Sequence, residues 1–64
     1  MSIDDVEIKS RWYVQLAAGA TLVEREVLDK TELTVLLRDP HSMSRYNTAR
    51  YRFDEITLVE VVVN

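Results

Sequence analysis

The stretch LTVLLRD (33–39) decides the fold. Leu33, Val35 and Leu37 recur with a period of two, which predicts a strand whose alternating apolar side chains face a hydrophobic core. Pro40 comes directly after this stretch. Because proline lacks a backbone N–H and holds the preceding residue extended, it predicts that the strand ends here and that a loop follows.

A second alternating stretch lies on the N-terminal side, in RWYVQLAAG (11–19). Trp12, Val14 and Leu16 share one face of the predicted strand, and we expect Trp12 to lie in the core or to cover one end of the barrel. The stretch ends at Gly19, the only glycine of the chain. Glycine adopts backbone angles that other residues resist, so Gly19 predicts a turn.

The segment ATLVEREVLD (20–29) fits neither a flat strand nor an amphipathic helix, because its apolar residues occur in adjacent pairs. A long strand that bends midway and exchanges its inward parity explains this pattern. Polar residues 29–32 then predict a turn. Residues 1–10 leave two interpretations open, a short helical turn or a frayed edge segment.

The C-terminal stretch ARYRFDEITLVEVVV (49–63) predicts two strands separated near the adjacent acids Asp54 and Glu55. Its first half alternates, with Tyr51 and Phe53 on one face and two arginines on the other. Its second half has apolar rows on both faces. Ile56, Leu58 and Val62 form one row, and Val59, Val61 and Val63 form the other.

A strand with apolar residues on both faces is typical of the middle of a larger assembly. We therefore expect one face or edge of residues 56–63 to contact another subunit. A monomer whose final strand is fully covered is the alternative. The expected fold is all-β: a single domain spanning residues 1–64, built as a small, strongly bent, five-stranded barrel of the SH3-like type.

Composition narrows the functional classes. Eight Lys and Arg against eleven Asp and Glu give a net charge of −3, which opposes nonspecific binding of nucleic acid. There is no cysteine, and the single histidine, His41, is a poor basis for a metal site, so we expect no metal and no cofactor. No segment predicts a membrane span or a secretion signal, so we expect a cytoplasmic protein. A chain of this size buries a small core, which favours association with other copies.

These stretches resemble the Sm-like family. VQLAAG (14–19) and LTVLLRD (33–39) are similar to its first motif, and YRFDEIT (51–57) is similar to the second motif of the bacterial RNA-chaperone branch. Arg52 and Phe53 stand where that branch has Lys and His, and the glycine usual in the family's bent strand is absent. The resemblance implies a homo-oligomeric ring in which the fourth strand of one subunit pairs with the fifth strand of its neighbour. Tyr51, Val59, Val61 and Val63 are the expected interface residues.

The resemblance also implies weak binding of single-stranded RNA at the pore of the ring. Aromatic rings stack on bases and arginines contact phosphates, so the basic and aromatic residues are the candidates. They are Arg50, Arg52, Phe53, His41, Tyr46 and Asn47. In the competing interpretation the aromatic rings belong to the core, the arginines are solvated or paired with Glu24 and Glu26, and the acidic surface binds a basic protein partner.

Catalysis has little support in the sequence. Ser42, Ser44 and His41 are close along the chain, but a serine nucleophile also needs an orienting acid and an oxyanion site. We therefore expect neither enzymatic activity nor a small-molecule substrate.

Overall fold

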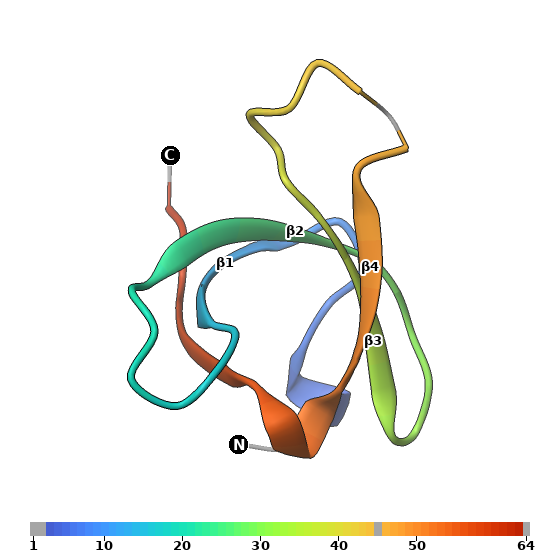
Figure 1. Cartoon of the computed structure of the whole chain (residues 1–64). Helices are drawn as coiled ribbons and strands as arrows, with labels where there is room; N and C mark the ends of the chain where they lie inside the picture. Colours follow the sequence, from blue (N-terminus) through green and yellow to red (C-terminus); the bar gives the residue numbers. More distant parts are fainter. Residues whose placement is uncertain (1–2, 45, 64) are drawn as a thin grey trace.

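The structure, a computed structural model, describes residues 3–44 and 46–63. One antiparallel sheet forms most of it (Figure 1). The elements, in chain order, are the 3₁₀ turn η1 (Ile3–Asp5), the strands β1 (Arg11–Gln15), β2 (Val23–Lys30), β3 (Thr34–Arg38) and β4 (Thr48–Arg52), the 3₁₀ turn η2 (Phe53–Glu55) and the strand β5 (Thr57–Val61).

The sheet is five-stranded, with the order β4-β3-β2-β1-β5. It bends around a single core, which gives a small all-β, barrel-like fold, as the sequence predicts. The buried residues of this core are Val6, Trp12, Val14, Val27, Val35, Leu37, Ile56 and Leu58. The turn η2 connects the two outermost strands, so β4 and β5 approach each other at one end of the barrel (Figure 1).

The bend of β2 follows from an extra residue in its pairing with β3. Val27 lies opposite Leu37, but Asp29 lies opposite Leu36, so Leu28 is bulged. A bulge shifts the alternation of side chains by one residue. Val27 consequently points into the core before the bulge, and Lys30 lies opposite the buried Val35 after it. The predicted exchange of parity within this strand is confirmed.

Two of the three predicted core residues of the next strand are confirmed. Val35 and Leu37 are buried in β3, whereas Leu33 is 69% exposed. The prediction for Leu33 is wrong because the strand begins one residue later, at Thr34. Gly19 has a φ of +78°, so the predicted turn after the first alternating stretch is confirmed.

The N-terminal segment closes one end of the barrel. Val6 is fully buried, and the Lys30 Nζ, at the end of β2, donates a hydrogen bond to the Ile3 carbonyl at 3.1 Å. Ser10 joins this segment to β1, because its hydroxyl accepts a hydrogen bond from the Trp12 indole at 2.9 Å. Of the two alternatives for the first ten residues, the helical turn is present as η1.

A second bulge corrects the prediction for the last strand. Tyr13 lies opposite Glu60 and Val14 opposite Leu58, so Val59 is the extra residue. Val61 then lies opposite Trp12, and opposed residues project from the same face of a sheet. The predicted row of Val59, Val61 and Val63 on one outward face is therefore interrupted. All three are exposed in the single chain, and Val59 and Val61 are close to half exposed.

Within residues 3–44 and 46–63 there is no helix whose length and apolar character would let it cross a bilayer.

Candidate functional site

The outer edge of β4 faces away from β3 and presents two basic residues. The Phe53 N–H donates to the Leu33 carbonyl at 2.8 Å. The direction of the backbone N–H and C=O groups alternates along an antiparallel strand. Those of Tyr51 therefore point toward β3, as those of Phe53 do, and those of Arg50 and Arg52 point to the outer edge. The register agrees, since Tyr51 lies opposite Val35.

The outer edge of β5 can be located in the same way. The Val62 N–H donates to the Arg11 carbonyl at 2.8 Å. The backbone N–H and C=O groups of Val61 therefore point away from β1, to the outer edge. Continuing through the bulge, Leu58 lies opposite Val14 and also directs its backbone outward. Within the described part of the chain, β5 pairs only with β1, as β4 pairs only with β3. Each edge therefore offers backbone donors and acceptors that a further strand can use.

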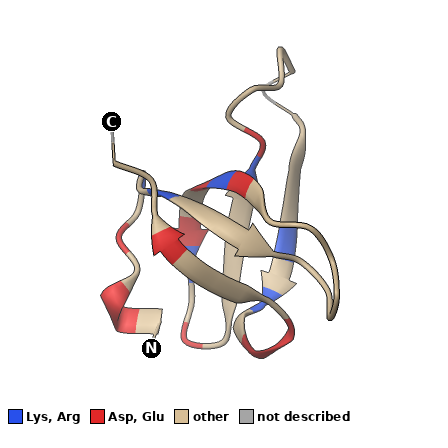
Figure 2. Ribbon diagram, turned by 90° about the vertical axis from the view of Figure 1, so that its left-hand side faces the viewer, with Lys and Arg blue, Asp and Glu red and all other residues tan. Residues whose placement is uncertain are grey.

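The two edges differ in charge. β4 has the sequence TARYR and contains two arginines, whereas β5 has the sequence TLVEV and contains Glu60. In Figure 2, blue marks the basic residues of β4 and red marks the acidic residue near the end of β5. The acids Asp54 and Glu55 of η2 lie at the start of β5. The β4 edge is accordingly basic and the β5 side is acidic.

Arg52 is held by the turn that follows it. Its Nε and Nη2 donate to Oδ1 and Oδ2 of Asp54, each at 3.2 Å. This hydrogen bonding, and then the charges of Asp54 and Glu55, raise the pKa of the Arg52 guanidinium above its ordinary value. Both side chains are nevertheless well exposed, at 59% for Arg52 and 68% for Asp54. The pair is thus a surface pair that a competing charge can reach.

The neighbouring residues of the basic segment are held by the barrel. The Arg50 Nη1 donates to the Thr34 hydroxyl at 2.9 Å, and the Arg50 side chain is exposed. Tyr51 and Phe53 are half-buried and pack against the core. The alternation predicted for this stretch is confirmed, with its aromatic rings inward and its arginines outward. Whether these residues contact RNA or another subunit stays a prediction.

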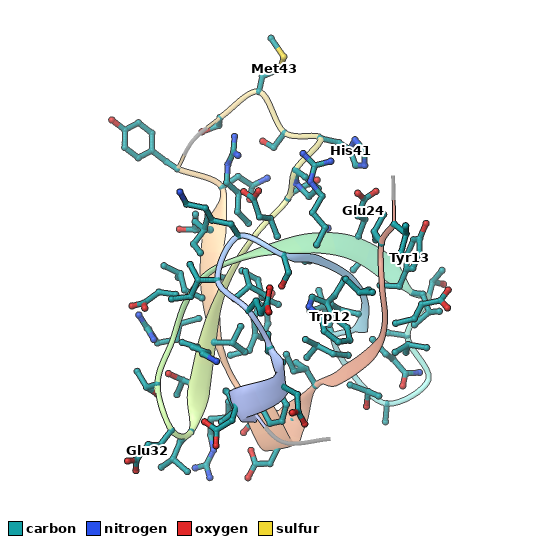
Figure 3. All side chains as sticks on the ribbon, turned by 180° about the vertical axis from the view of Figure 1, so that it is seen from behind. Trp12, Tyr13, Glu24, Glu32, His41 and Met43 are labelled. Carbon is teal, nitrogen blue, oxygen red and sulfur yellow. The ribbon has the colours of Figure 1, made fainter. Side chains whose placement is uncertain are left out.

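The structure separates the candidate RNA contacts into two groups. His41, Tyr46 and Asn47 lie in the loop before β4, while Arg52 and Phe53 lie at the far end of that strand. At about 3.3 Å per residue, the length of β4 puts roughly 13 Å of backbone between the two groups. His41 and Met43 project at one end of the barrel and Glu32 at the other (Figure 3). The candidate RNA contacts therefore do not come together within one copy of the chain.

The loop is tied to β2 by its histidine. The His41 Nε2 and the Glu24 Oε2 are 2.7 Å apart. The backbone N–H of His41 donates to Asp39 Oδ1 at 2.9 Å. Glu24 also contacts Arg11, with 3.6 Å between Oε1 and Nη1. Figure 3 shows His41 directed toward Glu24.

The acids of β2 form ion pairs with cations other than the predicted ones. Glu26 pairs with Arg38 at 3.7 Å and Glu24 pairs with Arg11 at 3.6 Å, while the His41 ring is hydrogen-bonded to Glu24. The alternative in which these acids pair with Arg50 and Arg52 is therefore wrong. Arg11 and Arg38 are thus paired with acids of the same barrel, and among the arginines that the structure describes the two of the β4 edge are the most exposed.

A shallow cleft lies where η2 meets β5. It has a volume of about 370 Å³ and is lined by Phe53, Asp54, Ile56, Thr57 and Leu58. Its walls combine apolar surface with the exposed Asp54 carboxylate, which suits a long side chain with an apolar stem and a cationic end. Among the described residues, no group of three or more His, Cys, Asp or Glu side chains could hold a metal ion.

Three features of the site were not anticipated from the sequence. These are the Arg52–Asp54 pair, the cleft, and the bulge at Val59. The spacing of two residues between Arg52 and Asp54 was a usable signal, because a tight turn after a strand brings such residues together. The bulge left no signal, since the apolar alternation continues through it.

Comparison of the chain with protein-family models, with curated proteins and with solved structures gives no match.

Proposed function

We propose that this chain is a non-catalytic assembly module, a small Sm-like barrel that forms a homo-oligomeric ring. In this proposal the β4 strand of one copy pairs with the β5 strand of the next. One observation carries it: the sheet ends in two strands whose outer edges are open and opposite in charge.

Self-association accounts for both edges at once. An open strand edge presents unpaired backbone groups and invites further pairing. A head-to-tail contact uses two different surfaces of the same molecule, and it closes into a ring when the rotation between copies allows. Each copy then contributes its basic edge to one neighbour and its acidic edge to the other, so no edge remains open.

Exposed apolar residues support the same arrangement. Val59 and Val61 are 48% and 46% exposed, and Val63 is more exposed still. A strand added along β5 would cover part of this surface. Tyr51 is half-buried in its own barrel, so only its exposed part is available to a neighbour. Among residues 3–44 and 46–63 the hydrophobic core comprises eight buried residues, which makes the extra stabilisation from an interface valuable in a chain of 64 residues.

Strand pairing is tested by blocking the β5 edge without disturbing its bonds to β1. Proline is tolerated on the open side of an edge strand, where no hydrogen bond is lost. We expect Val61→Pro to give a folded monomer by circular dichroism and light scattering. Val61→Thr keeps both the N–H and the β-branched shape, so it should assemble as the wild type does. A wild-type chain that stays monomeric at micromolar concentration would rule out the proposal.

Binding of single-stranded RNA to the ring is a second candidate function. The observation that favours it is the adjacency of Arg52, which is exposed, and Phe53, which is only half-buried. In a ring these two residues would recur once per subunit, and a weak site repeated in this way binds with avidity. Across a ring, the loop residues His41, Tyr46 and Asn47 of one copy would have to approach Arg52 of another.

An RNA titration separates this candidate from a role confined to protein partners. We expect fluorescent oligo-U and oligo-A to bind with an affinity that falls as salt rises and with Arg52→Ala. Lys9→Ala, which removes the same charge from an exposed residue before β1, is the matched control and should bind as the wild type does. If the assembled protein does not bind at high micromolar concentration, the acidic surface and a basic protein partner become the preferred explanation.

A further inference from the structure

The cleft where η2 meets β5 is lined by residues of β5 itself, the strand to which a second copy would add its β4 strand. Its floor is apolar, from Phe53, Ile56 and Leu58, and its rim carries the Asp54 carboxylate. In the single chain this carboxylate is bonded to Arg52, although both side chains remain well exposed. The cleft therefore combines apolar side chains with a negative charge, next to the β5 edge.

The direction of the backbone groups limits which residues of a second copy can reach the cleft. Opposed residues of an antiparallel pair either both direct their backbone groups at each other or both direct them away. Leu58 directs its groups to the outer edge of β5, and Arg50 and Arg52 direct theirs to the outer edge of β4. The two registers with most overlap place Leu58 opposite Arg50 or opposite Arg52 of the second copy.

Both registers bring an incoming Arg52 to the cleft. With Leu58 opposite Arg52, the arginine lies beside Leu58, which lines the cleft. With Leu58 opposite Arg50, Arg52 falls two positions nearer the start of the strand, beside Ile56, which also lines the cleft. Arg52 of the second copy therefore reaches the cleft in either of these two antiparallel registers.

We propose that the cleft binds the Arg52 side chain of the neighbouring copy, and that Asp54 exchanges its bond with Arg52 of its own chain for one with the neighbour. The inference rests on the proposed assembly and adds a side-chain contact between the β4 strand of one copy and the β5 side of the next. The methylene groups of the incoming side chain would cover Ile56 and Leu58. Its guanidinium would donate two parallel hydrogen bonds to the carboxylate, as arginine commonly does.

Two charge-reversed variants test the exchange. Arg52→Asp gives a chain that is negative both at position 52 of β4 and in the cleft, and Asp54→Arg gives a chain that is positive at both. Each variant should repel its own copies and stay monomeric where the wild type assembles, with a dissociation constant raised about tenfold or more. In an equimolar mixture, each β4 edge finds a cleft of opposite charge, so light scattering should show a mass above the monomer.

Glu55→Arg is the matched control, because it makes the same charge change on η2 at a residue that does not line the cleft. Because it also makes the β5 side less acidic, it should weaken association a few-fold, clearly less than Asp54→Arg does. The neutral variants Arg52→Gln and Asp54→Asn provide a second test if a reversed chain fails to fold, and each should associate more weakly than the wild type.

The outcomes separate this inference from the assembly itself. If the wild type assembles but the mixture of reversed variants stays monomeric, the exchange is wrong and strand pairing stands. If each reversed variant assembles alone like the wild type, the exchange is wrong as well. A monomeric wild type would overturn both proposals.

Discussion

The two edge strands have the same length but contact the rest of the molecule in opposite ways. β5 places Leu58 in the core and leaves its other residues exposed. β4 has no fully buried residue, and only Tyr51 is partly covered. One edge is therefore fixed by an apolar side chain and the other mainly by its backbone ladder to β3. The difference indicates that β5 is the more strongly anchored of the two strands, and that it is apolar and acidic. β4 is the exposed, basic strand that is suited to pair with β5 of another copy.

The largest effect should come from removing the core contact of β5. Leu58→Ala leaves a cavity in a well-packed interior, and such changes lower the free energy of unfolding by about 2–5 kcal/mol. Thermal unfolding followed by circular dichroism measures the change. Val59→Ala, at the exposed bulge of the same strand, is the matched control and should stay within about 0.5 kcal/mol of the wild type. Equal losses at the two positions would contradict the assignment of β5 as anchored on one side.

A smaller effect is expected from the charge of the β4 edge. Arg50→Glu removes the hydrogen bond to Thr34 and makes the edge less basic, while its side chain stays in solvent. Exposed charge pairs contribute up to about 1 kcal/mol, so we expect association to weaken about fivefold and to become less sensitive to salt. Sedimentation at two salt concentrations measures both. If Arg50→Glu associates more tightly than the wild type, the two edges are not complementary in charge.

The smallest effect is expected at the loop before β4. His41→Ala removes the contact with Glu24, but the imidazole is mostly exposed, and exposed ion pairs contribute little. The melting temperature and the dissociation constant should both stay close to those of the wild type. A clear loss of association would show instead that this end of the barrel takes part in the interface.

Much of the fold follows from short-range alternation. The periods of two around Val14, Val35 and Leu37 identified strands and inward faces, and the paired apolar residues near Leu28 identified the bend. These features are local, so the sequence carries them. Leu33 was misplaced because the strand boundary depends on the turn before it, where alternation gives no information. Val6 was missed because its burial depends on a contact with distant strands.

The candidate site was less predictable than the fold. The outward direction of Arg50 and Arg52 followed from alternation, but the partners of these arginines did not. Arg52 binds Asp54 through the geometry of η2, and the acids of β2 take other cations because of the register between strands. Register is a property of the whole sheet. A one-residue bulge such as that at Val59 changes it without altering the apolar pattern.

The burial of Val6 limits how far this chain can be shortened. A deletion series that begins at Arg11 would keep the five described strands yet discard the buried Val6 side chain and the Ile3 carbonyl that Lys30 binds. The minimal folding unit therefore starts ahead of the first strand, and a library that randomises the leading residues should retain an aliphatic side chain at position 6.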